Sequence, residues 1–336
     1  MANGIYALQK IQAAINASSD SDDYVPATFL WRGTGQLEDT RNLYFVNENV
    51  GNLSGSNRTN TSLLGGKITL DAIEGTYKQF PHLLNMSIKA SSGVTDSGEV
   101  YTYTYPFPTT AVQALQPYTI EGGDNSGAEA LNFVHCMDWT LSGEGGKAWM
   151  MSGNLFGKKV IPQAFTGGAT LPDVQNDTMN FSQSQLFIDA DSDTWGTTLV
   201  SNTLLKATLK YNAKLVAKAA ADGVLTFSYV VAPMPDITLA VTFEHNASAL
   251  SAKVDWRAET PKLIRIKNTG AAFASPGNTY ANKTVIMDLA GKWLKFNKIG
   301  NMNGNDILEG TFQVRNSDVQ ASAGQIVVAN NTATLA

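Results

Sequence analysis

The sequence is poor in the residue types on which many enzymes and secreted proteins depend. It has one cysteine, Cys136, and 3 histidines in 336 residues. A single cysteine excludes an intrachain disulfide. Charged residues make up only 16% of the chain, and the acidic excess gives a formal charge of −5. This balance argues against a basic surface that grips nucleic acid.

Long apolar runs are missing as well. No apolar stretch approaches the roughly 20 residues that a membrane-spanning helix needs. The first six residues lack a basic segment followed by an apolar core, so they do not resemble a secretory signal. We therefore expect no membrane association, and folding in a reducing cytoplasm.

Strand alternation is the dominant pattern in what remains. Residues 101–105 read Tyr-Thr-Tyr-Thr-Tyr, which places three Tyr on one face of a strand, and residues 263–267 alternate apolar and cationic side chains. A Gly-rich turn at 142–146 between two apolar stretches predicts a hairpin. Other strands are expected at 25–31, 43–45, 67–72, 118–121, 134–141, 148–156, 184–190, 199–210, 224–231, 236–244, 283–289, 307–314 and 319–328.

Helical signals are few. One helix is expected at 80–88, with Pro81 in its first turn. A second is expected at about 246–258, with Asn246 as the N-cap. Near the start of the chain, the spacing of Leu8, Ile11 and Ile15 suits one face of a short helix. The fold class is therefore mainly β.

A weak internal echo predicts that the chain is a duplicated β domain. Segments in the first half recur in the same order in the second half, at a spacing far longer than a solenoid or propeller repeat. We predict an extended N-terminal arm at 1–40, a first module at 41–175 with a linker from about 157, and a second module at 176–336. The matched segments are 43–45 with 186–188, 61–70 with 202–210 (141 residues apart), 141–143 with 289–291, and 151–156 with 308–312.

The ionisable residues form no recognisable catalytic or metal motif. His82, His135 and His245 lack metal-ligand spacing. His135 and Cys136 are adjacent, but neighbours on a strand point to opposite faces and cannot act as a nucleophile–base pair. Asp189, Asp191 and Asp193 resemble the start of a calcium loop, yet Thr194 and Val200 occupy the places of the required Gly and Glu, which favours a solvated hairpin tip. Residues 143–148 fit a turn better than a phosphate-binding loop.

Two further patterns leave alternatives open. The stripe of Tyr101, Tyr103 and Tyr105 could be a stacking platform for sugars or bases, although a sheet core explains it better and an interface next best. Paired carboxylates exist at Asp71/Glu74 and Asp236/Glu244, but a glycosidase pair requires a defined separation. We expect no enzyme, no catalytic residues and no cofactor-binding or metal-binding residues.

An ordered set of segments resembles the tail tube protein, or major tail protein, of long-tailed phages (siphophages). The set covers about 260 residues and contains no catalytic signature. Its members are Trp31-Arg32-Gly33-Thr34-Gly35, Arg41-Asn42-Leu43-Tyr44-Phe45, Tyr118-Thr119-Ile120-Glu121-Gly122-Gly123-Asp124-Asn125, Phe243-Glu244-His245-Asn246, Trp256-Arg257-Ala258-Glu259-Thr260 and Asp288-Leu289-Ala290-Gly291-Lys292-Trp293.

The resemblance implies a fold and a set of partners. Tail tube modules are β-sandwiches or small barrels flanked by a short helix, and six modules form a ring whose inner wall is a continuous β-barrel. Stacked rings pass double-stranded DNA without binding it specifically and enclose the tape measure protein. Tail terminator and distal tail proteins are further implied partners, and the implied location is the virion, after assembly in the host bacterial cytoplasm.

The echo adds an expectation about stoichiometry. A chain with two modules would complete a pseudo-six-fold ring as a homotrimer, with a homohexameric ring as the alternative. The arm at 1–35 and the loops at 46–60 and 91–99 are candidates for ring-to-ring contacts, or are plain solvent loops. Two other functions remain open, a β-sandwich adhesin that binds surface glycans and a tail-associated glycosidase.

Overall fold

Antiparallel strands make up most of the fold, with two α-helices in the part of the chain that the structure describes. This computed structural model describes residues 4–16, 23–55, 57–170 and 177–335. The elements of the first half are η1 (Tyr6–Leu8), β1 (Lys10–Ile15), β2 (Phe29–Trp31), β3 (Gly35–Asp39), β4 (Asn42–Phe45), β5 (Thr59–Leu63), β6 (Gly66–Glu74), α1 (Phe80–Ser87), β7 (Val94–Ser97), β8 (Val100–Pro106), β9 (Tyr118–Gly123), β10 (Ala128–Glu144), β11 (Met150–Gly157) and β12 (Val160–Pro162).

The second half follows the sequence expectations closely. The expected strands at 184–190 and 236–244 are confirmed at both ends, and both expected helices are confirmed. Its elements are η2 (Phe181–Gln183), β13 (Ser184–Ala190), β14 (Leu199–Val200), β15 (Leu204–Asn212), β16 (Val216–Lys218), β17 (Tyr229–Val231), β18 (Asp236–Glu244), α2 (Ala247–Arg257), β19 (Lys262–Ala272), β20 (Asn282–Phe296), β21 (Gly300–Met302), β22 (Asn305–Val314) and β23 (Gly324–Asn330).

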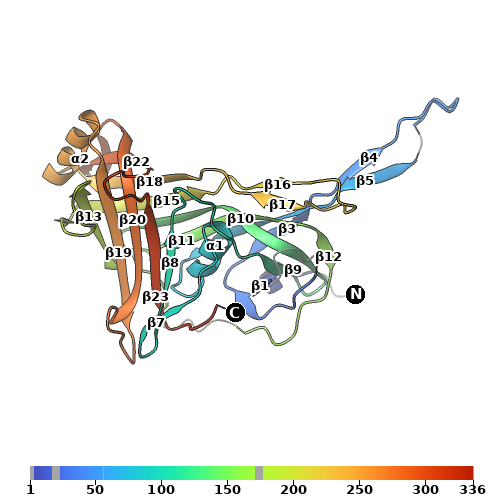
Figure 1. The fold of residues 1–336 in the computed structure, drawn as a ribbon, viewed down its shortest axis with the longest axis horizontal. Helices are drawn as coiled ribbons and strands as arrows, with labels where there is room; N and C mark the ends of the chain where they lie inside the picture. Colours follow the sequence, from blue (N-terminus) through green and yellow to red (C-terminus); the bar gives the residue numbers. More distant parts are fainter. Residues whose placement is uncertain (1–3, 17–22, 56, 171–176, 336) are drawn as a thin grey trace.

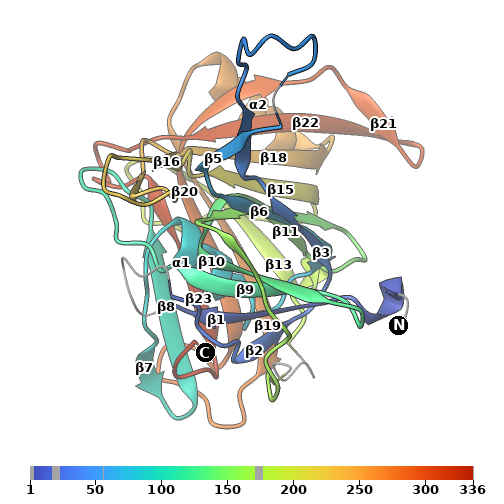
Figure 2. The same ribbon diagram turned by 90° about the vertical axis from the view of Figure 1, so that its right-hand side faces the viewer.

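Eight of these strands form one continuous antiparallel sheet, called the long sheet below. Its order is β3-β6-β11-β10-β15-β18-β22-β20. The junction between β10 and β15 joins the first half of the chain to the second, over the register Asp138↔Asn212 to Glu144↔Lys206. Figure 2 shows β22, β18 and β15 side by side in its upper half. Strands β3 and β20 therefore stand at the two ends of the long sheet.

The pairing order in residues 10–162, the first repeat, recurs in residues 184–330, the second repeat. The ladder β3-β6-β11-β10 corresponds to β15-β18-β22-β20. Strand β10 then continues between β9 and β12, as β20 continues between β19 and β23. Beyond them, β9-β1-β2 corresponds to β19-β13-β14. Helix α1 follows β6 as α2 follows β18, and the hairpin β7–β8 is an insertion that pairs with β23.

Matching bulges fix the correspondence between the repeats residue by residue. Strand β10 bulges between Cys136 and Asp138, and β20 bulges between Trp293 and Lys295. Gly153 lies opposite Trp139, and Gly310 lies opposite Phe296. Both comparisons give an offset of 157 residues (136 to 293, 153 to 310).

This offset corrects part of the sequence echo. The match of 151–156 with 308–312 has the right register, because it compares β11 with β22. The match of 61–70 with 202–210 is wrong, because β15 corresponds to β3 and β6 corresponds to β18. The match of 141–143 with 289–291 compares the equivalent strands β10 and β20, but it aligns residues that do not correspond. The domain boundary expected near 175 lies outside the described residues.

The N-terminal segment is part of the folded body. Residues 10–15 form β1, which pairs with β2 on one side and β9 on the other, so the helix expected from Leu8, Ile11 and Ile15 is wrong. Residues Ile11 to Ala14 are all buried. A strand covered on both faces has a continuous apolar run, and here its spacing also fits a helix.

Other expectations need smaller corrections. The expected linker from 157 contains β12, which pairs with β10. The loop expected at 91–99 contains β7. The strand expected at 224–231 is confined to β17. No helix in the described ranges is long and apolar enough to cross a membrane.

The core of the long sheet lies under α1 and joins the two repeats. The Trp139 ring stacks on Tyr211 across the β10–β15 junction, with ring centroids 5.5 Å apart, and meets the edge of Phe80 from α1. Its indole N–H donates to Ser87 Oγ over 3.0 Å. Trp139 therefore fixes the helix, the first repeat and the second repeat at one point.

Trp139→Ala should lower the free energy of unfolding by about 3–5 kcal/mol, because it removes a large buried ring and leaves a cavity. Trp139 is 1% exposed. Chemical denaturation followed by circular dichroism measures the change. Tyr44→Ala, at a side chain that is 57% exposed, is the matched control and should stay within about 0.5 kcal/mol of the parent chain. Equal losses in the two variants would contradict this account of the core.

Candidate functional site, a polar sheet face and its edges

One face of the long sheet is apolar and buried. Leu141, Leu209, Leu239 and Phe312 lie directly opposite one another across β10, β15, β18 and β22, and all are at most 1% exposed. Side chains alternate between the two faces along each strand. The residues between these positions must therefore form the opposite face.

The opposite face of the long sheet is a continuous polar surface. Thr140, Lys210, Thr238 and Gln313 form one row across the same four strands. In the neighbouring row, the Asn154 amide donates to Asp138 Oδ1 over 2.8 Å. The Gln313 amide donates to Asp236 Oδ1 over 2.9 Å. The face is thus ordered by cross-strand hydrogen bonds.

Charges of both signs are interspersed on this face, and carboxylates outnumber cations. Glu144 contacts Lys147 and Lys206 at 3.0 and 3.2 Å, and exposed pairs of this kind contribute little stability. Such a face has no basic stripe to hold a phosphate backbone. Its cations are Lys67, Lys206, Lys210, Lys292 and Lys295, and its carboxylates are Glu38, Asp71, Glu74, Asp138, Glu144, Asp236, Glu244 and Glu309.

The two ends of the long sheet carry opposite charges. Within the described ranges, β3 pairs with β6 alone, and residues 292–296 of β20 pair with β22 alone. Glu38 and Asp39 are exposed on β3, where Asp39 forms an ion pair with Arg41 and Glu38 is the carboxylate left over. Lys295 and Lys298 are exposed on or just beyond β20. An edge strand presents backbone groups that can pair with another chain.

The hairpin β4–β5 projects away from the body, as Figure 1 shows at its upper right. Leu43, Tyr44 and Phe45 are 47%, 57% and 60% exposed. The hairpin continues beyond its strands through an Arg58–Glu48 ion pair of 2.6 Å. Adjacent exposed apolar side chains are typical of a surface that becomes covered by a partner.

The corresponding hairpin of the second repeat, β16–β17, lies against the first repeat. Phe227, between its strands, packs on Phe133 and Phe156, with ring centroids 6.1 and 5.8 Å apart. The Leu64 N–H donates to the Leu225 carbonyl over 2.7 Å. The β16–β17 hairpin of the second repeat thus lies over the first repeat, with which β15 is paired.

Two of the three histidines, His82 and His135, and the cysteine occupy core positions, whereas His245, just after β18, is half-buried. His82 is stacked on Phe29, with ring centroids 4.3 Å apart, and its Nδ1 lies 2.9 Å from the Tyr118 hydroxyl. Burial lowers the pKa of His82 to about 3 and that of His135 to about 4. Burial also raises the pKa of the Cys136 thiol well above its usual value, the opposite of what a nucleophile needs.

Asp189 is buried, so the expectation that the 189–193 segment is a solvated tip is wrong at this residue. Asp189 Oδ2 accepts from the Gly196 N–H over 2.7 Å, and Oδ1 accepts from the Thr197 hydroxyl and the Thr198 N–H. The carboxylate closes its own loop with these bonds, as Asx turns do. No group of three His, Cys, Asp or Glu in the described ranges could hold a metal ion.

The tyrosine stripe belongs to the core. Tyr103 and Tyr105 are fully buried. Their hydroxyls donate to the carbonyls of Thr332 and Pro81, over 2.6 and 3.2 Å. These two rings therefore do not form a stacking platform.

The candidate carboxylate pair Asp236/Glu244 cannot act together. The two residues stand at opposite ends of β18, roughly 27 Å apart at the usual strand rise. Glycosidase pairs lie within about 10 Å. A groove beside the junction, lined by residues that include Val112, Leu215 and Met234, has no carboxylate, imidazole or thiol among its described lining residues.

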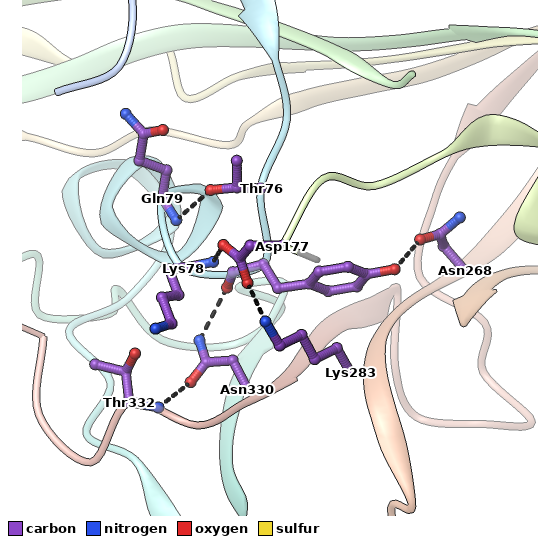
Figure 3. Close-up of polar contacts among 9 residues, drawn as sticks. Thr76, Lys78, Gln79, Asp177, Asn268, Lys283, Asn330 and Thr332 are labelled. Carbon is purple, nitrogen blue, oxygen red and sulfur yellow. Dashed lines mark hydrogen bonds and ion pairs between the residues drawn. The ribbon is translucent and has the colours of Figure 1, made fainter. Parts of the chain in front are cut away.

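A buried polar cluster surrounds Asp177, which precedes the second repeat (Figure 3). Lys283 Nζ donates to Asp177 Oδ1 over 3.0 Å, and Asp177 Oδ2 accepts from the Lys78 N–H over 3.1 Å. The Tyr77 hydroxyl donates to Asn268 Oδ1, and the Asn330 amide donates to the Tyr77 carbonyl over 2.9 Å. Burial raises the pKa of Asp177 in spite of the Lys283 contact. The cluster connects both repeats and is structural.

Sequence reasoning missed the polar face, the two edges and the exposed hairpin. Alternation marks one face of each strand as polar, but the strand order is needed to join these faces into one surface. No protein-family model matches the chain, and no curated protein matches it.

Acidification should destabilise the protein through its buried histidines. The native state holds His82 and His135 neutral, with pKa values of about 3 and 4, whereas unfolded histidine has a pKa of about 6.5. Unfolding therefore takes up protons below pH 6.5, and stability falls as the pH drops through that window.

The expected loss between pH 7 and pH 5 is about 2 kcal/mol for each histidine. Urea denaturation at several pH values measures it. His82→Gln should remove about half of the loss that the two histidines cause together. An unchanged slope in His82→Gln would show that His82 does not carry this dependence.

Proposed function

We propose that this chain is the structural subunit of a phage tail tube, a virion protein that self-assembles into stacked rings around a lumen. The observation that carries the proposal is the long sheet, which has a polar face free of helices and an edge at each end. An open sheet with two unpaired edges can form part of a larger barrel when each edge pairs with a further sheet.

The size of the long sheet supports three copies in a ring. Three sheets of eight strands give about 24 strands, and a barrel of that size is roughly 50 Å across between backbones at ordinary spacing and tilt. Side chains on the inner face leave a lumen wider than a DNA duplex. Two copies would give about 16 strands, which is the size of a porin channel. Six copies would double the width.

In this proposal the polar face of the long sheet lines the lumen. Its excess of carboxylates over cations suits the passage of DNA, because a basic wall would bind phosphates tightly. The tape measure protein would occupy the same lumen during assembly, and tail terminator and distal tail proteins would bind the two ends of the tube. Residues 46–60, at the tip of the exposed hairpin, are candidates for contacts between copies.

A β-sandwich adhesin is the second candidate, because Tyr44 and Phe45 are exposed aromatic residues. The two are adjacent on β4, so their rings point to opposite faces of the hairpin. They cannot form one flat sugar-stacking platform. Binding of the monomer to host glycans, lost in Tyr44→Ser, would favour the adhesin.

Negative-stain electron microscopy of the purified chain should show rings or tubes with a central hole. A trimeric mass in light scattering should accompany the rings. A protein that stays monomeric at high concentration, with no lumen in any assembly, would overturn the tail tube proposal.

Assemblies should also fail to retain DNA at about 0.15 M salt, because the lumen face has no basic excess. A fluorescent duplex measured by anisotropy tests this. The matched control is the double variant Glu144→Lys/Glu309→Lys, which reverses two carboxylates on the same face and should introduce salt-dependent binding. Tight binding by the unmodified chain would contradict a conduit that lets DNA pass without holding it.

A further inference from the structure

We propose that copies of this chain join head to tail by pairing the β20 edge of one copy with the β3 edge of the next. The register would be the one that β10 and β15 already use within a single chain. The inference builds on the proposed ring, and it names the two surfaces that form it.

The equivalence of the repeats supplies the two partners. Strand β10 corresponds to β20, and within the chain β10 pairs with β15. Strand β15 in turn corresponds to β3. Within the chain, the edge of β10 in the first repeat pairs with β15 of the second repeat. Among the described residues, the equivalent edge of β20, in the second repeat, is open, and so is the edge of β3 that is equivalent to the paired edge of β15.

The ladders also fix the register. Asp138 and Lys295 are equivalent, because each follows the bulge of its strand. Leu209 and Leu37 are equivalent, since they pair with Leu239 and Ile68 at matching positions.

The observed pairs Asp138↔Asn212 and Thr140↔Lys210 then translate directly to the new junction. They become Lys295 opposite Thr40, and Asn297 opposite Glu38, of the next copy. Residues 295–297 and 38–40 would form one end of the interface.

Charge at the two edges fits this register. Lys295 and Glu38 are both exposed in the single chain. At the proposed junction they lie on the same face of the sheet, diagonal to each other by one step of two residues. Diagonal neighbours are within reach of long side chains, and opposite charges at such positions are favourable.

The exposed hairpin gives an independent reason. Within the chain, β16–β17 lies over the repeat to which its β15 is paired, with Phe227 against Phe133 and Phe156. By the same geometry, β4–β5 would lie over the second repeat of the copy to which β3 is paired. In a single chain that copy is absent, and Leu43, Tyr44 and Phe45 are exposed.

The interface is heterologous, because two different edges meet. Such contacts form a closed ring when the rotation between copies closes, and an open filament when it does not. The same junction within the chain already sets the rotation between the first and second repeats.

A disulfide across the proposed junction tests the inference. The full-length chain carries Cys136→Ala, to remove its one thiol, with Lys295→Cys and Thr40→Cys. After mild oxidation, a non-reducing gel should show covalent dimers and then a limiting covalent trimer that dithiothreitol reverses. Each single-cysteine variant should give no product larger than a dimer.

The matched control places cysteines at the equivalent positions inside the chain, Asp138→Cys with Asn212→Cys. It should form an intramolecular disulfide without larger products, which shows that this register brings two such positions within bonding distance. If Lys295→Cys/Thr40→Cys does not fold, the pair Asn297→Cys/Glu38→Cys tests the same register one step along.

The outcomes separate the interface from the function. Rings in the microscope without any cross-link in either cysteine pair would overturn this interface and leave the tail tube proposal standing. Cross-linked oligomers that never enclose a lumen would support the interface and overturn the tube. A chain that neither cross-links nor assembles would overturn both.

Discussion

The ladder between β10 and β15 is the interaction on which the rest of this structure depends. It runs from Asp138↔Asn212 to Glu144↔Lys206 and joins two four-stranded ladders into one sheet. The stack of Trp139 on Tyr211 lies at this junction, and α1 packs on the same tryptophan. Without this ladder each repeat would present one more open edge, and neither the continuous polar face nor its two opposed ends would exist.

Local sequence patterns predicted most helices and strands. They failed where both faces of a strand are buried, because such a strand does not alternate between apolar and polar residues. Alternation located β13 and β18 at both ends, and Asn246 caps α2 by accepting from the Ala249 N–H, as its position in the sequence predicted. Strand β1 was mistaken for a helix because both of its faces are covered. The internal echo was real at β11 and β22 but misaligned β6 with β15, since short strands of similar composition match by chance.

The candidate site could not be read from the sequence because it is a property of strand order. Thr140, Lys210, Thr238 and Gln313 are each ordinary outward residues of a strand, and only the pairing places them in one row. Strands β10 and β20 are bent, and each pairs within the long sheet at one end and with other strands at the other end. This double pairing also follows from strand order and not from a local pattern. At Gly291 an added Cβ would lie 2.1 Å from the Gln313 carbonyl oxygen. This close approach of the two strands requires a glycine at position 291, but no neighbouring residue in the sequence predicts it.

The two junctions of the proposed ring would differ in strength, and the difference has a physical consequence. Inside the chain, Trp139 lies opposite Tyr211 and Leu141 opposite Leu209, so this junction is apolar and costs no association entropy. Between chains, Phe296 would lie opposite Asp39, and Lys295 beside Glu38. A junction of this polar kind gains less from apolar burial and also pays for the lost freedom of two molecules. In the proposed ring, fusion of two repeats would secure half of the junctions in advance, and closure would depend on the other half, whose pairing varies with protein concentration.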